Sequence, residues 1–183
     1  MEVNFTHTPA KPVEPIYIEQ VFAEKPGGGV VANPTFDVPP TTAVGKSGNQ
    51  FVAIKAYKLH TAVAAADTKI KIAKGSGVAV GDVIATGKKG VACTAVDTSN
   101  DEYDEVTVTL GVAVAEGTTL YQAKAASADA AAPLATPDYV TGNWVHANKG
   151  DQLVRLINGA NLRKETANVA PEVVALLPTI KLV

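Results

Sequence analysis

Two segments of this chain contain residue types that can carry out chemistry, and the first is Gly45-Lys46-Ser47. It matches the end of a phosphate-binding loop, G-x-x-x-x-G-K-[ST], in which backbone amides cradle a phosphate. The first glycine of that motif would fall at position 40, where the chain has Pro40. Proline has no amide proton, and a proline pair rather than a strand leads into the run. We therefore expect no phosphate site here.

The second segment is acidic and runs from Asp97 to Glu105. Its carboxylates could supply oxygen ligands for Ca²⁺, but the glycine and terminal glutamate of an EF-hand loop are missing. One interpretation is a metal-assisted hydrolase that uses Asp97, Asp101 and Asp104. The favoured interpretation is an exposed hairpin connection whose charges keep a sheet edge soluble.

The remaining reactive residue types are scattered. His7, His60 and His146 lack metal-ligand spacing, no nucleophile elbow G-x-S-x-G occurs, and the single cysteine, Cys93, lies in an apolar strand pattern typical of a core residue. We therefore predict no catalytic residue, no cofactor and no metal, and a protein that is not an enzyme. The net charge of −2 and the lack of a long apolar run argue against nucleic acid and membrane as partners.

The elements that position these residues are predicted to be short strands. Ile70 and Ile72 alternate with lysines, and Val106, Val108 and Leu110 alternate with threonines, which is the period of a half-buried strand. Glycine turns separate such runs, so we predict an all-β fold, a sandwich or barrel of short strands with a short C-terminal helix that begins at Pro171. The strands are expected at about 51–59, 69–73, 82–86, 91–96, 105–114, 119–122, 143–147, 152–157, 162–166 and 179–183, and the alanine-rich 123–136 as a short helix or a loop.

Residues 1–50 have a different composition. They hold seven of the eleven prolines, which prevents a continuous sheet, yet they are too apolar for permanent disorder. We predict that 1–50 is an extended arm that lies along the surface of its own domain or of a neighbour, of which the neighbour is favoured, and that 51–183 is a β-rich body, with an internal linker at 123–142 left open. The partner-binding residues expected in the arm are Ile16, Tyr17, Ile18, Phe22 and Phe36.

The chain resembles a known family over roughly residues 50–183. The runs TKIKIAKGSGVAVGDVIA and TAVDTSNDEYDEVTVTLGVAVAEGTTLYQA, and LVRLINGANLRKETANVAPEVVALLP near the C-terminus, are similar to head-fibre or auxiliary (decoration) capsid proteins of tailed bacteriophages, especially phages of gut Bacteroidales. This resemblance implies a structural virion protein made in the host cytoplasm and bound to the outer capsid surface. The implied partners are the major capsid protein, further copies of the chain, commonly as a trimer, or other head-fibre proteins.

The alternative is a β-rich surface module that recognises a host glycan or receptor. Such a module needs exposed aromatic side chains on loops, and the sequence offers Tyr103, Tyr139 and Trp144 for that role.

Overall fold

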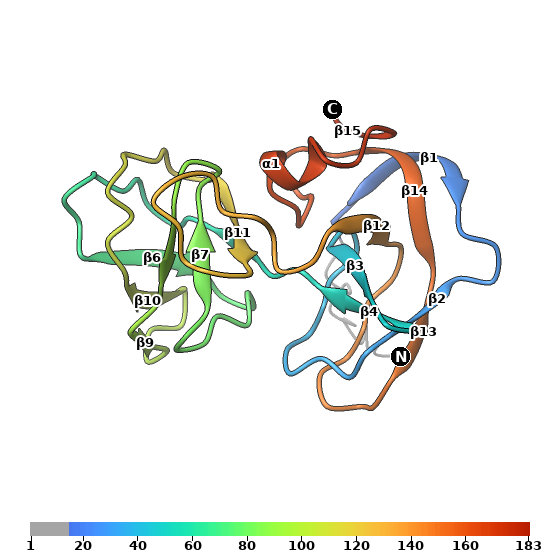
Figure 1. Ribbon diagram of the computed structural model, residues 1–183, viewed down its shortest axis with the longest axis horizontal. Coiled ribbons are helices and arrows are strands. Elements are labelled where there is room, and N and C mark those ends of the chain that lie inside the picture. The colour runs from blue at the N-terminus through green and yellow to red at the C-terminus, as the bar shows by residue number, and fades with distance from the viewer. Residues whose placement is uncertain (1–14) are drawn as a thin grey trace, which may run out of the picture.

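The computed structural model describes residues 15–183, and these form fifteen strands and one short helix (Figure 1). The predicted all-β fold is confirmed. The strands gather in two lobes. Residues 15–55 and 134–183 form the barrel lobe. Residues 56–133 form a second, inserted lobe: the chain enters it after residue 55 and returns to the barrel lobe at residue 134. Within the described residues no helix is both long and apolar enough to cross a membrane.

A single curled sheet builds the barrel lobe. Its strand order is β1-β14-β12-β3-β4-β2-β13, and β15 adds to β14 in parallel. Strand β13, at one end of this order, runs directly into β14, next to the other end, with only Arg155 between them, so the sheet curls round although β1 and β13 do not pair. The strands are β1 Ile18–Glu24, β2 Gly29–Val31, β3 Ala43–Ser47, β4 Gln50–Ala53, β12 Pro137–Thr141, β13 Gln152–Val154, β14 Leu156–Leu162 and β15 Ile180–Leu182, and the helix is α1 Pro171–Val174.

Two smaller antiparallel sheets build the inserted lobe, with orders β6-β10-β9 and β5-β11-β7-β8. The alternation seen in the sequence is present: Ile70 pairs with Val106, and both side chains are buried. The long apolar run that follows β10 stays buried at Val108 and Leu110 after the strand has ended. The strands are β5 Ala56–Lys58, β6 Lys69–Ala73, β7 Val83–Ala85, β8 Gly90–Ala92, β9 Ala95–Asp97, β10 Tyr103–Thr107 and β11 Thr119–Ala123.

The predicted separation of an arm, 1–50, from a body, 51–183, does not match the structure. Residues 15–50 are part of the barrel lobe: they supply β1, β2 and β3, and the boundary at 50 falls inside the β3–β4 hairpin. The reason is that Ile18 and Val21 of β1 pack against the protein's own core. Residues 1–14 lie outside the described part of the chain.

Three further expectations need correction, and one is confirmed. The 143–147 strand is only an isolated bridge between Val38 and Val145, and the strand before it, β12, was not predicted. The 162–166 strand is absent from the structure because β14 ends at Leu162. The linker expected at 123–142 shrinks to the irregular 124–136. Helix α1 begins at Pro171, as predicted.

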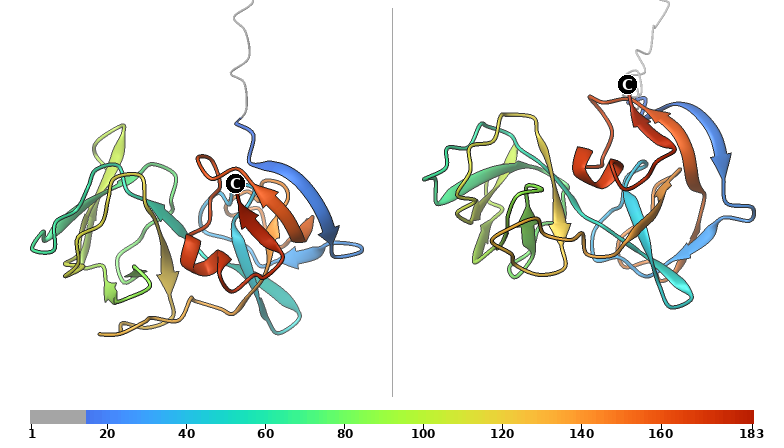
Figure 2. Two further views of the ribbon diagram at one scale, coloured as in Figure 1. Left: turned by 90° about the horizontal axis from the view of Figure 1, so that it is seen from above. Right: turned by 45° about the horizontal axis from the view of Figure 1, so that its top comes forward.

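The two lobes share a hydrophobic core. Tyr121 and Ala123 of the inserted lobe pack in one cluster with Val140, Ile157 and the α1 residue Val173 of the barrel lobe. Both views in Figure 2 place α1 at the junction, between the barrel sheet and the inserted lobe. Because burial of this apolar area would be lost on separation, the lobes form one packed unit.

A buried polar network lies where the chain enters the inserted lobe. The Asp82 carboxylate accepts hydrogen bonds from Lys55 Nζ (2.8 Å), the Tyr57 hydroxyl (3.0 Å), Gln122 Nε2 (2.9 Å) and the Ala79 amide (2.9 Å). Burial and the nearby carboxylate raise the pKa of Tyr57 well above its usual range, so the phenol stays a donor. The network fixes Lys55, at the end of the barrel lobe, to the inserted lobe.

Gly77 of the inserted lobe lies directly against Phe36 of the barrel lobe. Its φ is +66°, and an added Cβ would lie 2.3 Å from Cβ of Phe36 in the barrel lobe. Because that contact is to the base of the Phe36 side chain, a rotamer change does not relieve it. Gly75, in the same turn, has a φ of +82° and open space around it.

We therefore expect Gly75→Ala to lower the free energy of unfolding by about 1 kcal/mol, the cost of a left-handed conformation. Gly77→Ala should lower it by about 1–3 kcal/mol more, because overpacking adds to the same backbone penalty. Urea denaturation of the two variants measures the difference. Equal losses would mean that Phe36 moves away from Gly77 at no cost.

Candidate functional site

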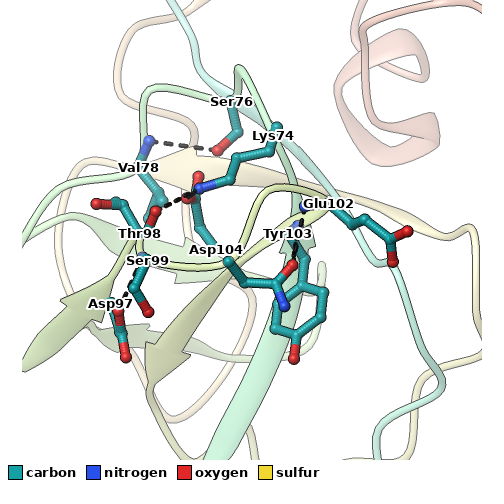
Figure 3. A network of polar contacts seen from close by, with 10 residues as sticks. Lys74, Ser76, Val78, Asp97, Thr98, Ser99, Glu102, Tyr103 and Asp104 are labelled. Atoms are coloured by element: carbon teal, nitrogen blue, oxygen red, sulfur yellow. Dashed lines mark hydrogen bonds and ion pairs between the residues drawn. The ribbon is translucent and has the colours of Figure 1, made fainter.

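The acidic segment is an exposed hairpin connection between β9 and β10 (Figure 3). Lys74 Nζ donates to Asp104 Oδ1 (2.7 Å) and to the Thr98 carbonyl (2.8 Å). The Ser99 amide donates to Asp97 Oδ1 (2.9 Å), and this bond lowers the pKa of Asp97. The exposed hairpin connection expected at 97–105 is confirmed, and the Lys74 ammonium lies beside the buried carboxylate of Asp104.

The other reactive residue types are dispersed. Gly45-Lys46-Ser47 lies at the end of β3 and leads into a hairpin, with no helix after it. Cys93 is buried, and burial raises the pKa of its thiol. The His60 ring stacks on Tyr103 at 5.3 Å, whereas His7 is outside the described residues. Over residues 15–183, no three His, Cys, Asp or Glu side chains come together as metal ligands do.

The five residues predicted to bind a partner fall in different environments. Phe22 on β1 and Ile16 just before it are 58% and 56% exposed. Tyr17 and Ile18 are half-buried, and Ile18 packs against the core. Phe36 is half-buried at the junction of the lobes, with Lys55 Nζ 5.4 Å from its ring centre. Only Ile16 and Phe22 of this set present most of their surface to a partner.

Ile16 and Phe22 belong to the edge of the barrel sheet. Among the described strands, β1 pairs only with β14, so its other side is an open sheet edge. Val183 is also 56% exposed, but it follows β15, which lies on the other side of β14 from β1. We call Ile16 and Phe22 the edge surface.

A second feature is a hollow lined by aromatic side chains at the junction of the lobes. Two adjoining cavities of about 360 and 410 Å³ share Tyr17, Asp37 and Trp144. His146 lines the smaller cavity, and Lys58 of the inserted lobe lines the larger one. We call this hollow the aromatic cleft.

The aromatic cleft combines two perpendicular aromatic rings with ionisable side chains beside them. The Tyr17 and Trp144 rings stand at 87° with centres 6.5 Å apart, and Trp144 is 40% exposed. Asp37 Oδ1 accepts from the Ala147 amide (2.8 Å) and lies 3.8 Å from His146 Nδ1. The cleft thus combines two aromatic surfaces with a carboxylate.

The other two aromatic residues suggested for glycan recognition lie elsewhere. Tyr139 packs edge-on against Phe51 at 5.6 Å, and Tyr103 carries Lys71 Nζ 4.4 Å above its ring in addition to His60. Nothing in the sequence pointed to Asp37 as a site residue, and Tyr17 and Trp144 were predicted to have unrelated roles. No local pattern could join them, since they are far apart along the chain.

No protein-family model, curated protein or solved structure matches this chain.

Proposed function

We propose that the protein is a structural component of a phage virion, one that decorates the outside of the head and stabilises the capsid or forms the attached base of a head fibre. The sequence resemblance over residues 50–183 supports this role. The structural observation that carries it is Phe22, a large apolar side chain 58% exposed on the open edge strand β1.

The proposed attachment uses that edge. An edge strand offers unpaired backbone groups, and a segment of the major capsid protein can add to them as a further strand. Phe22 then supplies an apolar anchor beside the backbone pairing, as large side chains do in interface hot spots. Copies arranged around a symmetry axis, such as a trimer, would multiply this contact into tight overall binding.

Co-sedimentation with capsids assembled from the major capsid protein of the same phage genome tests the proposal. Deleting residues 1–45 is unsuitable because it removes β1, β2 and most of β3. We use Phe22→Asp instead, with Val80→Asp as the control, since Val80 is also an exposed apolar residue but lies in the inserted lobe.

We expect saturable binding of the unmodified protein, a loss of at least about tenfold in affinity for Phe22→Asp, and no change for Val80→Asp. Failure of the unmodified protein to sediment with capsids would refute the role. Unchanged binding of Phe22→Asp would refute the edge as the attachment surface.

A further inference from the structure

We infer that the aromatic cleft is a binding site for a neutral saccharide of one to a few sugar units. This inference does not depend on the capsid role, because it rests on the cleft at the junction of the lobes and not on Phe22 of the edge strand. Three observations carry it: the arrangement of the two rings, the charges around them, and the packed junction of the lobes at which the cleft lies.

The first observation is the corner made by Tyr17 and Trp144. Sugar rings have one face rich in C–H bonds, and these positively polarised hydrogens pack well on the negative face of an aromatic ring. Because the two ring planes stand at 87°, they offer such a ligand two perpendicular surfaces to pack against. With Trp144 40% exposed, an indole surface is available without rearrangement of the protein.

The second observation concerns charge. Asp37 lies beside His146, and the ammonium of Lys74, which lines the larger cavity, is paired with Asp104. The Lys58 ammonium, also at the cleft, donates to the Glu165 carbonyl (2.9 Å). Asp104 neutralises Lys74, and the cleft keeps one carboxylate, Asp37, and one ammonium, Lys58, which have opposite signs, so it carries no net charge that would select an anion or a cation. A carboxylate at its rim is instead suited to accept hydrogen bonds from sugar hydroxyls.

The third observation is that the cleft is preformed. Asn168 is held by Thr41 and Thr42, which pair with its backbone amide and its side-chain Nδ2 at 2.8 Å each. The cleft lies where the two lobes share a core, so its walls do not depend on a loop alone. Its volume falls within the range of about 300–1,000 Å³ usual for small-molecule sites, which often occur at such junctions.

The test uses Trp144 as its own reporter, because it is the only tryptophan in the chain. The full-length protein is screened on an array of neutral, N-acetylated and acidic oligosaccharides. Free forms of the sugars that bind are then titrated while Trp144 emission is followed. We expect binding to neutral or N-acetylated sugars and a saturable change in emission.

Calorimetry with the same sugars then compares variants. Trp144→Ala should weaken binding at least about tenfold, as for other tryptophan contacts at binding sites. Asp37→Asn keeps the shape of the side chain and should weaken it severalfold. Leu153→Ala, a change at an exposed leucine outside the cleft, should leave affinity unchanged, and thermal unfolding of each variant confirms that it is folded.

Several results would overturn the inference. They are no binding on the array, binding confined to acidic sugars, binding unaffected by Trp144→Ala in a folded variant, and saturable binding of a proline-rich peptide with no sugar binding. Because Phe22→Asp leaves the cleft intact, its effect on capsid sedimentation and its normal sugar binding separate this site from the capsid role.

Discussion

Replacing Asp82 by asparagine is expected to lower the free energy of unfolding by about 3–5 kcal/mol. The Lys55 and Asp82 side chains are only 10% and 11% exposed, so the substitution leaves a lysine charge in the interior without its partner. It also weakens the bonds that the carboxylate accepts from Tyr57 and Gln122. The effect is large because several donors converge on one group.

Urea denaturation, followed by far-ultraviolet circular dichroism, measures this loss. Glu24→Gln is the matched control: it removes one charge from the Glu24–Arg155 pair, whose side chains are about half exposed, and should change stability by less than about 1 kcal/mol. The single variant Lys55→Met and the double variant Lys55→Met/Asp82→Asn complete the comparison. The double variant should lose less free energy of unfolding than the sum of the losses in the two single variants. A loss below about 1 kcal/mol for Asp82→Asn would mean that water enters and solvates Lys55.

Leu156→Ala is expected to lower the free energy of unfolding by about 2–5 kcal/mol. Leu156 is completely buried in one hydrophobic cluster, and its neighbour Ile157 is completely buried in another. Strand β14 therefore separates two cores, because successive side chains point to opposite faces of a strand. The alanine leaves a cavity that a strand paired on both sides cannot collapse to fill.

The matched control for this change lies three positions earlier. Leu153→Ala on β13 removes the same atoms from a side chain that is 72% exposed, and should alter stability by no more than about 0.5 kcal/mol. Thermal and urea unfolding of both variants give the comparison. Similar losses in the two variants would contradict the assignment of β14 to the interior of the barrel lobe.

The strands of the inserted lobe were the most predictable part of the fold. Strand β6 has the predicted bounds, because alternation at Ile70 and Ile72 is a local signal that needs no knowledge of the partner strand. The barrel lobe was less predictable. Strand β12 begins at Pro137 and has no clear alternation, and its formation depends on partners from both halves of the chain.

The composition of residues 1–50 did not reveal that 15–50 supply strands to the protein's own sheet. Proline content and apolar content are the same for a strand that completes its own sheet and for an arm that binds a neighbour. The pairing of Val21 with Ala160 decides between them, and it is a property of the folded chain. The aromatic cleft was unpredictable for the same reason, since Tyr17, Asp37 and Trp144 meet only in the folded chain.

The insertion between β4 and β12 sets an order for folding. The inserted lobe is continuous in sequence, so its strands can pair as soon as they leave the ribosome. The barrel lobe must wait, because Ile18 pairs with Leu162 and Val44 with Tyr139. Such distant pairings close large loops and form slowly. During synthesis β1, whose only described partner is β14, therefore remains unpaired longest, and a chaperone or a neighbouring chain has its greatest opportunity to capture it then.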